Sequence, residues 1–193
     1  MRVGQNPAKS VNYVAQPKKV TIAVINYIPT LGGYYAQSLD VLKTCMGSIW
    51  ENTDVTYDLL VFDNASCQEV RNYLREMQEQ GKIQFLVLSE KNIGKAGAWN
   101  FVFGSAPGKF IAYADSDVYH YPGWLEPQIA LFEKFPQIGM VTGMPMWTPP
   151  EYSSATVKWA EDDPDISLEH GKFLSWDDYW RHARSLGADE HPF

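Results

Sequence analysis

Cysteine is scarce in this 193-residue chain, where only Cys45 and Cys67 are present, without the spacing of a metal-ligand pair. Basic residues are also outnumbered: 16 Lys and Arg stand against 23 Asp and Glu, for a formal net charge of -7 and a pI near 5.0. Proteins that bind a phosphate backbone use clustered Lys and Arg, so this composition argues against a nucleic-acid partner. No apolar run reaches the ~20 residues that a transmembrane helix needs, so no transmembrane segment is expected.

Residues 1–19 are polar and lack the apolar core of a secretory signal. Together with the scarcity of cysteine, this predicts a cytoplasmic protein, either free or held by its surface at the inner face of a membrane. Apolar residues make up 45% of the chain, and its length is enough for one sizeable core. We therefore expect a globular protein with a polar N-terminal lead.

Short apolar runs rich in β-forming residues alternate with longer segments of helical periodicity. The expected strands cover residues 20–26, 57–62 and 83–88, a fourth begins at residue 110, and a further candidate covers 138–142. Between the strands, apolar residues recur at helical spacing. This alternation is typical of βαβ units and predicts an α/β fold with a mostly parallel sheet.

Local signals suggest where two helices begin. Ser66 and Glu69 have the spacing of a capping box, in which the two side chains satisfy free amides at a helix start. Pro122 opens a second candidate start, because proline suits the first turn of a helix.

The composition changes near Trp147, where we place a domain boundary between residues 20–147 and 148–193. Beyond it lie a Pro-Pro pair, an acidic run and an amphipathic segment, which begins after a second capping pattern at Ser175 and Asp178. The apolar face of this segment predicts core packing and carries Trp176, Tyr179, Trp180, Ala183 and Leu186. A second hypothesis is an exposed patch that pairs two chains into a homo-oligomer, testable by light scattering and formed by Trp147, Trp159, Trp176 and Trp180.

Two carboxylates, Asp115 and Asp117, follow the apolar run that begins at Phe110. Carboxylates are rarely buried without a partner, so a pair of them beyond an apolar strand suggests a hydrated cleft that holds a cation. In open α/β sheets, ligands also bind at the carboxyl ends of the strands. Residues one apart on an extended segment point to opposite faces, so both can reach one ion only where the backbone turns.

Polar motifs follow the other predicted strands as well. In chain order, the series is Ile25-Asn26-Tyr27, Asp63-Asn64-Ala65-Ser66, Asn92-x-Gly94 with Asn100, Asp115-Ser116-Asp117 and Pro122-Gly123-Trp124-Leu125. The series resembles the family 2 glycosyltransferases of the GT-A fold, and the resemblance covers roughly residues 20–147. It implies a Rossmann-like twisted sheet flanked by helices on both faces, and the binding of a UDP-, GDP- or dTDP-sugar donor.

The resemblance also implies a role for each motif. Asn26 and Tyr27 would line the nucleoside pocket, and Asp63 and Asn64 would contact the base or ribose. The wall beside the sugar would be shaped by Asn92, Gly94 and Asn100.

Asp115-Ser116-Asp117 is similar to the DxD motif of that family. A divalent cation there would stabilise the charge that grows on a departing diphosphate. We expect Asp117 to ligate the cation directly, and Asp115 to hold the ribose or reach the metal through water. Mg²⁺ or Mn²⁺ suits such a sparse oxygen site, because water and the diphosphate can supply the other ligands.

The family usually continues into an acceptor-binding half that supplies the base of inverting enzymes, and this chain is expected to stop before it. The acceptor would be a hydroxyl of a glycan, a lipid or a small molecule, and no catalytic base is predicted. The acidic run that includes Glu161 and Asp165 is more simply a solvated surface than a source of that base.

Two alternatives remain open. The apolar strand followed by Asp115 also fits a haloacid-dehalogenase-like phosphatase, in which Asp115 would be the nucleophile, although that motif normally opens a chain's first strand. The other alternative is a non-catalytic or truncated nucleotide-sugar-binding module.

Overall fold

The computed structural model describes residues 3–143, 150–169, 171 and 175–185 of the chain. These residues belong to two compact units, Met1–Gly143 and Met144–Phe193. Trp147, where the sequence predicts a domain boundary, lies outside the described residues.

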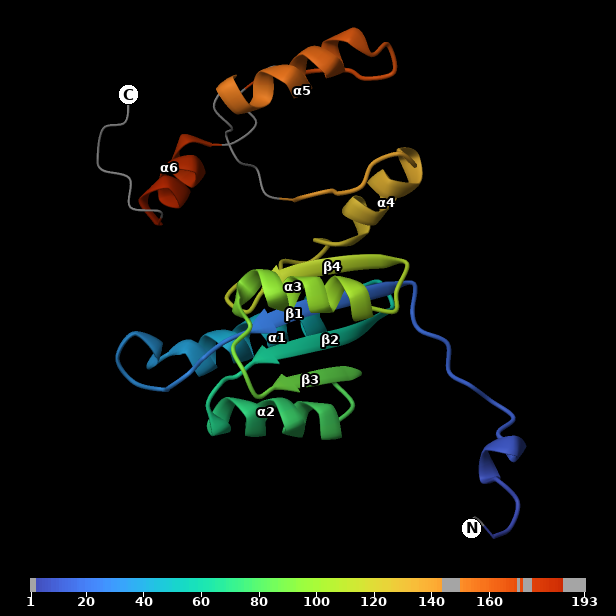
Figure 1. Ribbon diagram of the computed structural model, residues 1–193. Coiled ribbons are helices and arrows are strands. Elements are labelled where there is room, and N and C mark those ends of the chain that lie inside the picture. Colours follow the sequence, from blue (N-terminus) through green and yellow to red (C-terminus); the bar gives the residue numbers. More distant parts are fainter. Residues whose placement is uncertain (1–2, 144–149, 170, 172–174, 186–193) are drawn as a thin grey trace. The chain divides into compact units, whose positions relative to one another are not determined.

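The first unit is built on a four-stranded parallel sheet with the strand order β3-β2-β1-β4 (Figure 1). In chain order the strands are β1 (Val20–Asn26), β2 (Tyr57–Asn64), β3 (Phe85–Ser89) and β4 (Phe110–Asp115). In the last pairs of the two ladders that β1 makes, Asn26 lies opposite Asp63 of β2 and Ile25 lies opposite Asp115 of β4. Parallel pairing therefore places the motifs that follow the strands at one edge of the sheet.

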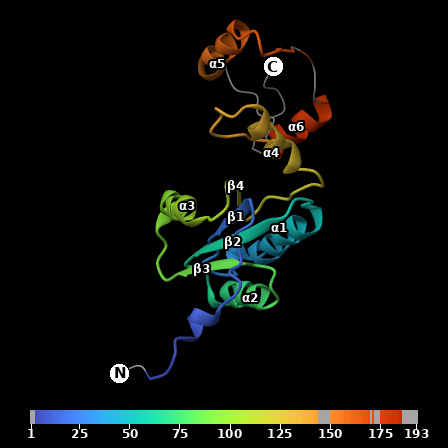
Figure 2. The ribbon, with the colours of Figure 1, turned by 90° about the vertical axis from the view of Figure 1, so that its right-hand side faces the viewer.

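Helices cover both faces of this sheet, as the resemblance implies. Figure 2 shows α1 and α2 on one face and α3 on the other. The helices of the first unit, with two short 3-10 turns, are η1 (Pro7–Ser10), η2 (Gly33–Tyr35), α1 (Ser38–Asn52), α2 (Gln68–Glu79), α3 (Gly94–Ser105) and α4 (Glu126–Lys134). The second unit contains α5 (Pro150–Asp162) and α6 (Trp176–Ser185).

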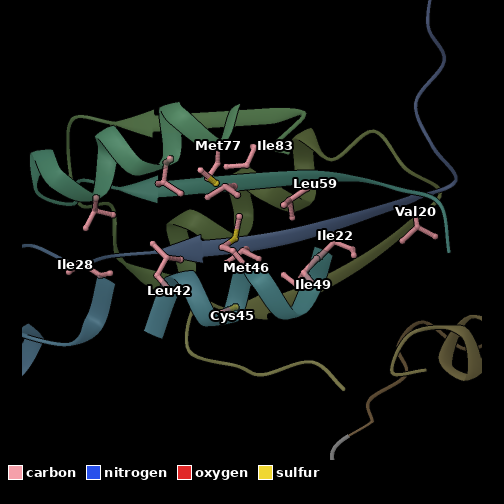
Figure 3. Close-up of a cluster of buried hydrophobic side chains, with 14 of the residues drawn as sticks. Val20, Ile22, Ile28, Leu42, Cys45, Met46, Ile49, Leu59, Met77 and Ile83 are labelled. Atoms are coloured by element: carbon pink, nitrogen blue, oxygen red, sulfur yellow. The ribbon is translucent and has the colours of Figure 1, made fainter. Parts of the chain in front are cut away.

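The core has two parts because successive side chains of a strand point to opposite faces. On one face Ile22 and Val24 of β1 pack with Leu42 and Met46 of α1, as Figure 3 shows for Ile22, Leu42 and Met46. On the other face Ala23 joins a smaller cluster that includes Leu60, Phe62, Ala98 and Val102. Because both faces of β1 and β2 are buried, their sequences are continuous apolar runs rather than alternating apolar and polar residues.

The prediction of a strand at 138–142 is wrong, because the structure has no strand there. Pro136 and Gly139 interrupt this region, and both residue types weaken a strand. The segment instead touches β4 through a side chain, since the Tyr113 hydroxyl donates to Met140 Sδ at 3.6 Å. The strands expected at 57–62 and 83–88 are present as β2 and β3, with ends shifted by one or two residues.

Both helix starts predicted in the first unit are also wrong. Gly123 has φ +76°, a left-handed conformation that a helix cannot continue, and α4 begins only at Glu126 with Pro127 in its first turn. At α2 the N-cap residue is Cys67 rather than Ser66. The Ser66 hydroxyl is engaged elsewhere, because it accepts hydrogen bonds from Asn26 Nδ2 and from the Ile28 amide.

In the second unit, Trp176 of α6 lies near Tyr179 and stacks on Trp180, with the two indole centroids 6.1 Å apart. Trp159 and Trp176 are 59% and 63% exposed, and the homo-oligomer contact stays a prediction. None of the helices in the described ranges is both long and apolar enough to cross a bilayer.

Candidate functional site

A pocket of about 360 Å³ opens at the carboxyl ends of the strands. Its walls come from the ends of β1, β2 and β4 and from the loop that enters α3, and they are formed by Ile25, Asn26, Tyr27, Asn64, Asn92, Gly94, Lys95, Asp115, Ser116 and Asp117. The structure therefore brings eight of the ten predicted site residues together around one cavity. Asp63 and Asn100 are the two predicted residues that do not line it.

Asn64, the last residue of β2, ties this strand to the loop before α3. Its Nδ2 donates to Asn92 Oδ1 at 3.0 Å and to the Gly94 carbonyl at 3.3 Å, while its Oδ1 accepts from the Ile93 amide at 2.9 Å. Asn92 Oδ1 also accepts from the Gly94 amide, and Gly94 adopts φ +74° where α3 begins. The Asn-x-Gly motif thus forms a turn held in place by β2, which makes one wall of the pocket rigid.

Asp63 lies behind the pocket wall, with none of its side chain exposed. Its Oδ1 accepts from Asn26 Nδ2 at 3.2 Å, and its Oδ2 accepts from the Ser66 amide at 3.1 Å and from Arg71 Nε at 3.3 Å. The turn that these bonds close holds Ala65 at φ +70°, a strained conformation for a residue other than glycine. Contact between Asp63 and a base or ribose stays a prediction.

Asn100 lies on α3 with an exposed side chain, apart from the residues that form the pocket. Its expected place beside a sugar also stays a prediction.

The acid pair lies where β4 ends and the chain turns. Asp115 is the last residue of the strand, Ser116 and Asp117 form a turn, and all three line the pocket. This is the backbone turn that two carboxylates one residue apart need in order to face one cavity. Lys95 approaches from α3 and pairs with Asp115, with Nζ 2.6 Å from Oδ2.

The donor set of this pocket fits a cation that keeps several ligands from outside the protein. The described residues contain no group of three or more His, Cys, Asp or Glu side chains that could enclose a metal. Asp115 and Asp117 provide carboxylate oxygens at the pocket, and Asp117 is exposed. Hard cations such as Mg²⁺ accept this arrangement, because they retain water and bind through one or two carboxylates together with substrate phosphates.

A second pocket of about 300 Å³ adjoins the first and shares Asp117 with it. It lies between α1 and the turn after β4, and it is lined by Gln37, Asp40, Val41, Thr44, Cys45, Asp117, Val118 and Tyr119. Burial, with a smaller contribution from the charge of Asp117, raises the pKa of the Cys45 thiol to about 11. Cys45 therefore remains a protonated, unreactive thiol at neutral pH.

His120 is a buried residue that links the segment after β4 to α1. The residue is 5% exposed, and its imidazole packs against the Trp124 indole at a centroid distance of 4.3 Å. Its amide donates to Ser48 Oγ at 3.0 Å, and its carbonyl accepts from Asn52 Nδ2 at 2.7 Å. Burial lowers the pKa of His120, because the charged imidazolium loses hydration.

Arg71 and Lys95 are two residues of this region whose roles are not predicted from the sequence. Both contacts depend on segments that folding brings together: Arg71 reaches Asp63 and the end of β3, and Lys95 reaches β4. A signal was present for Arg71, since a buried carboxylate at the end of β2 requires a cationic or hydrogen-bonding partner. No comparable signal in the sequence distinguishes Lys95 from a solvated lysine.

The parallel sheet, the helices on both faces and the pocket at the strand ends define an α/β protein of the GT-A fold. Among solved structures, this chain is similar to residues 1–349 of S. aureus TarS, with 18% identity and a TM-score of 0.50 over 66% of this chain and 38% of that chain. A structure of the same TarS segment in complex with UDP matches with the same identity and TM-score, over 67% of this chain and 38% of that chain.

The sequence model described as Glycosyl transferase family 2 matches residues 28–184. The chain therefore belongs to the glycosyl transferase family 2. It is 24% identical over 123 residues to an uncharacterized glycosyltransferase of Nostoc sp., covering 64% of this chain and 35% of that protein. It is also 26% identical over 87 residues to an uncharacterized glycosyltransferase of Rickettsia bellii, covering 45% of this chain and 12% of that protein. The chain thus spans about a third or less of the length of these relatives.

Family membership favours sugar transfer over the phosphatase alternative. Asp115 also stands at the end of the fourth strand in chain order, after three strand and helix units. A phosphatase of the haloacid-dehalogenase type would place this aspartate after its first strand.

Proposed function

We propose that this chain binds a nucleotide-sugar donor and a divalent cation in the pocket of about 360 Å³, and that the protein carrying it transfers the sugar to an acceptor hydroxyl. One observation carries the proposal: Asp115, Asp117 and the amide side chains at the ends of β1 and β2 surround one cavity in a family 2 chain. The TarS complex with UDP adds support, because a protein of the same fold binds this nucleotide.

Different residues of the pocket would contact different parts of the donor. Asn26 and Tyr27 at the end of β1 would receive the nucleoside, and the rigid turn made by Asn64, Asn92 and Gly94 would form the wall along which the ribose and sugar lie. Holding the donor in one orientation lowers the entropic cost of reaching the transition state.

Asp117, with Asp115, would hold the cation, Mg²⁺ or Mn²⁺. Such a cation, when bound, supplies electrostatic stabilisation for the negative charge of a departing diphosphate. Lys95 contributes a second positive charge at the same end of the pocket, since its ammonium already lies against Asp115. Transfer with inversion at the anomeric carbon is proposed on the basis of family resemblance.

Calorimetric titration tests donor binding. UDP, GDP and dTDP are titrated, each with and without Mn²⁺, into the wild type, Asp117→Ala and Asp54→Ala. Asp54 is an exposed carboxylate after α1, outside the residues that line the pocket, and is the matched control. We expect one nucleotide to bind to the wild type only when Mn²⁺ is present. The Kd of this nucleotide should be at least tenfold higher in Asp117→Ala, which corresponds to a loss of about 1.4 kcal/mol of binding free energy. The Kd should be unchanged in Asp54→Ala.

Absence of binding to all three nucleotides would contradict the proposal, as would binding that Asp117→Ala leaves intact. Metal-dependent binding without donor hydrolysis or transfer would support the alternative of a binding module.

A further inference from the structure

Arg71 of α2 joins the ends of two strands behind the pocket. Its Nε donates to Asp63 Oδ2 at 3.3 Å, its Nη2 donates to the Ser89 carbonyl at the end of β3, and its Nη1 pairs with Glu90 at 3.1 Å. The Arg71 side chain is 12% exposed and that of Asp63 is fully buried. A single guanidinium therefore bonds to both β2 and the β3 end, which its planar, forked geometry permits and a lysine ammonium would not.

Asp63 extends the same network to β1 and thus to the pocket itself. Its Oδ1 accepts a hydrogen bond from Asn26 Nδ2, which also donates to Ser66 Oγ at 3.0 Å. Because a carboxylate only accepts hydrogen bonds, Asp63 determines which end of the Asn26 carboxamide faces it. The nitrogen of Asn26 must point toward Asp63, and the oxygen must point elsewhere.

The oxygen of Asn26 is a buried acceptor without a hydrogen-bond partner in the described part of the chain. Asn26 itself is 2% exposed and lines the pocket. An unpaired buried acceptor is unfavourable, and native proteins rarely retain one unless another molecule satisfies it. A ligand group that carries an N–H or O–H donor would do so.

We infer that Arg71 is a positioning residue for the donor pocket, acting through Asp63 to hold Asn26 Oδ1 ready for an N–H or O–H donor of the nucleoside. Arg71 holds Asp63 in place, because it gives this fully buried carboxylate a cationic partner. Without Arg71, the buried Asp63 carboxylate would lose its cationic partner and leave this position, and the carboxamide of Asn26 would lose the acceptor that orients it. The identity of the bound group as a nucleoside rests on the proposed function.

The test compares Arg71→Met with Arg75→Met, which is the matched control. Arg75 lies one turn further along α2, is exposed, and makes a hydrogen bond of 3.5 Å to Asn72. The probe is the nucleotide that the wild type binds with Mn²⁺. We expect a Kd at least tenfold higher in Arg71→Met and within twofold of wild type in Arg75→Met, with Arg71→Lys between them. An equal Kd in Arg71→Met and wild type would overturn the inference.

Coupling to Asp63 separates positioning from a general loss of stability. If Arg71 acts through the charge of Asp63, then adding Arg71→Met to Asp63→Asn should raise the Kd by less than threefold beyond Asp63→Asn alone. Additive effects of the two substitutions would overturn the inference. Should Arg71→Met fail to fold, as judged by thermal unfolding, the comparison of Arg71→Lys in the wild-type and Asp63→Asn backgrounds decides in the same way.

A measurement without nucleotide keeps this inference distinct from the proposed function. The side-chain NH₂ signals of Asn26 in a ¹⁵N NMR spectrum should shift in Arg71→Lys and stay unchanged in Arg75→Met. Unmoved Asn26 signals would overturn the role of Arg71 even if nucleotide binds. Shifted signals in a protein that binds no nucleotide would support the network and contradict the nucleotide assignment.

Discussion

Lys95 and Asp115 are two residues of opposite charge in direct contact at the pocket, 2.6 Å apart. Both side chains are well exposed, at 65% and 43%, so solvent screens the pair and its contribution to stability is about 0–1 kcal/mol. The contact matters more for binding, because a cation at Asp115 must compete with an ammonium already there. Lys95 thus lowers the affinity of Asp115 for a metal cation.

Replacement of Lys95 by Met should increase the affinity for Mn²⁺ in the absence of nucleotide. Loss of a competing interaction of up to ~1 kcal/mol corresponds to a Kd about two- to fivefold lower. Electron paramagnetic resonance of free Mn²⁺ measures this directly. Lys91→Met is the control, since Lys91 is exposed in the preceding loop and its side chain has no ion pair in the described ranges. Equal or weaker Mn²⁺ binding in Lys95→Met would contradict this account of the pair.

At the scale of elements, the segment after β4 is anchored on α1. The backbone of His120 makes two hydrogen bonds to Ser48 and Asn52 of that helix, and its ring contacts both Ser48 Oγ and the Trp124 indole. This anchor lies three residues beyond Asp117, so the position of the acid pair depends on how firmly the segment is held.

The buried His120 should make stability depend on pH. Burial lowers its pKa in the folded state below its ordinary value of 6.5, so the folded protein binds this proton less readily than the unfolded chain does. The contribution of the neutral, buried His120 to the free energy of unfolding is therefore present above pH 6.5 and is lost as the pH falls below that value. Urea unfolding at pH 7.5 and 5.5 should show a smaller free-energy decrease for His120→Gln than for the wild type. An identical decrease in both proteins would contradict the assignment.

The whole first unit could largely be predicted from the sequence, because its decisive signals are local. Strands buried on both faces leave apolar runs such as Val20–Asn26, and polar motifs directly after such runs must meet at one edge of a parallel sheet. Features that depend on tertiary structure could not be read in this way. The apolar run at 138–142 has the composition of a strand, and only its neighbours in the fold show that it is not one. Ser66 has the position of a helix cap in the sequence, but its hydroxyl instead accepts a hydrogen bond from Asn26.

In the first unit as a whole, donor and cation are proposed to bind at one end of the sheet. The strands are five to eight residues long, at ~3.3 Å per residue, so their amino ends lie roughly 20 Å from the acid pair. A paramagnetic ion at the proposed site should therefore distinguish the two ends of the sheet.

The most direct measurement is an amide NMR spectrum with UDP and substoichiometric Mn²⁺, because Mn²⁺ broadens the signals of nuclei close to it. We predict that signals from residues 25–27, 92–95 and 115–117 broaden first, while those of Val20, Tyr57 and Phe110 at the amino ends of the strands persist. Broadening that begins at those amino ends, or in the acidic run at 161–165, would contradict the claim that this pocket is the donor site.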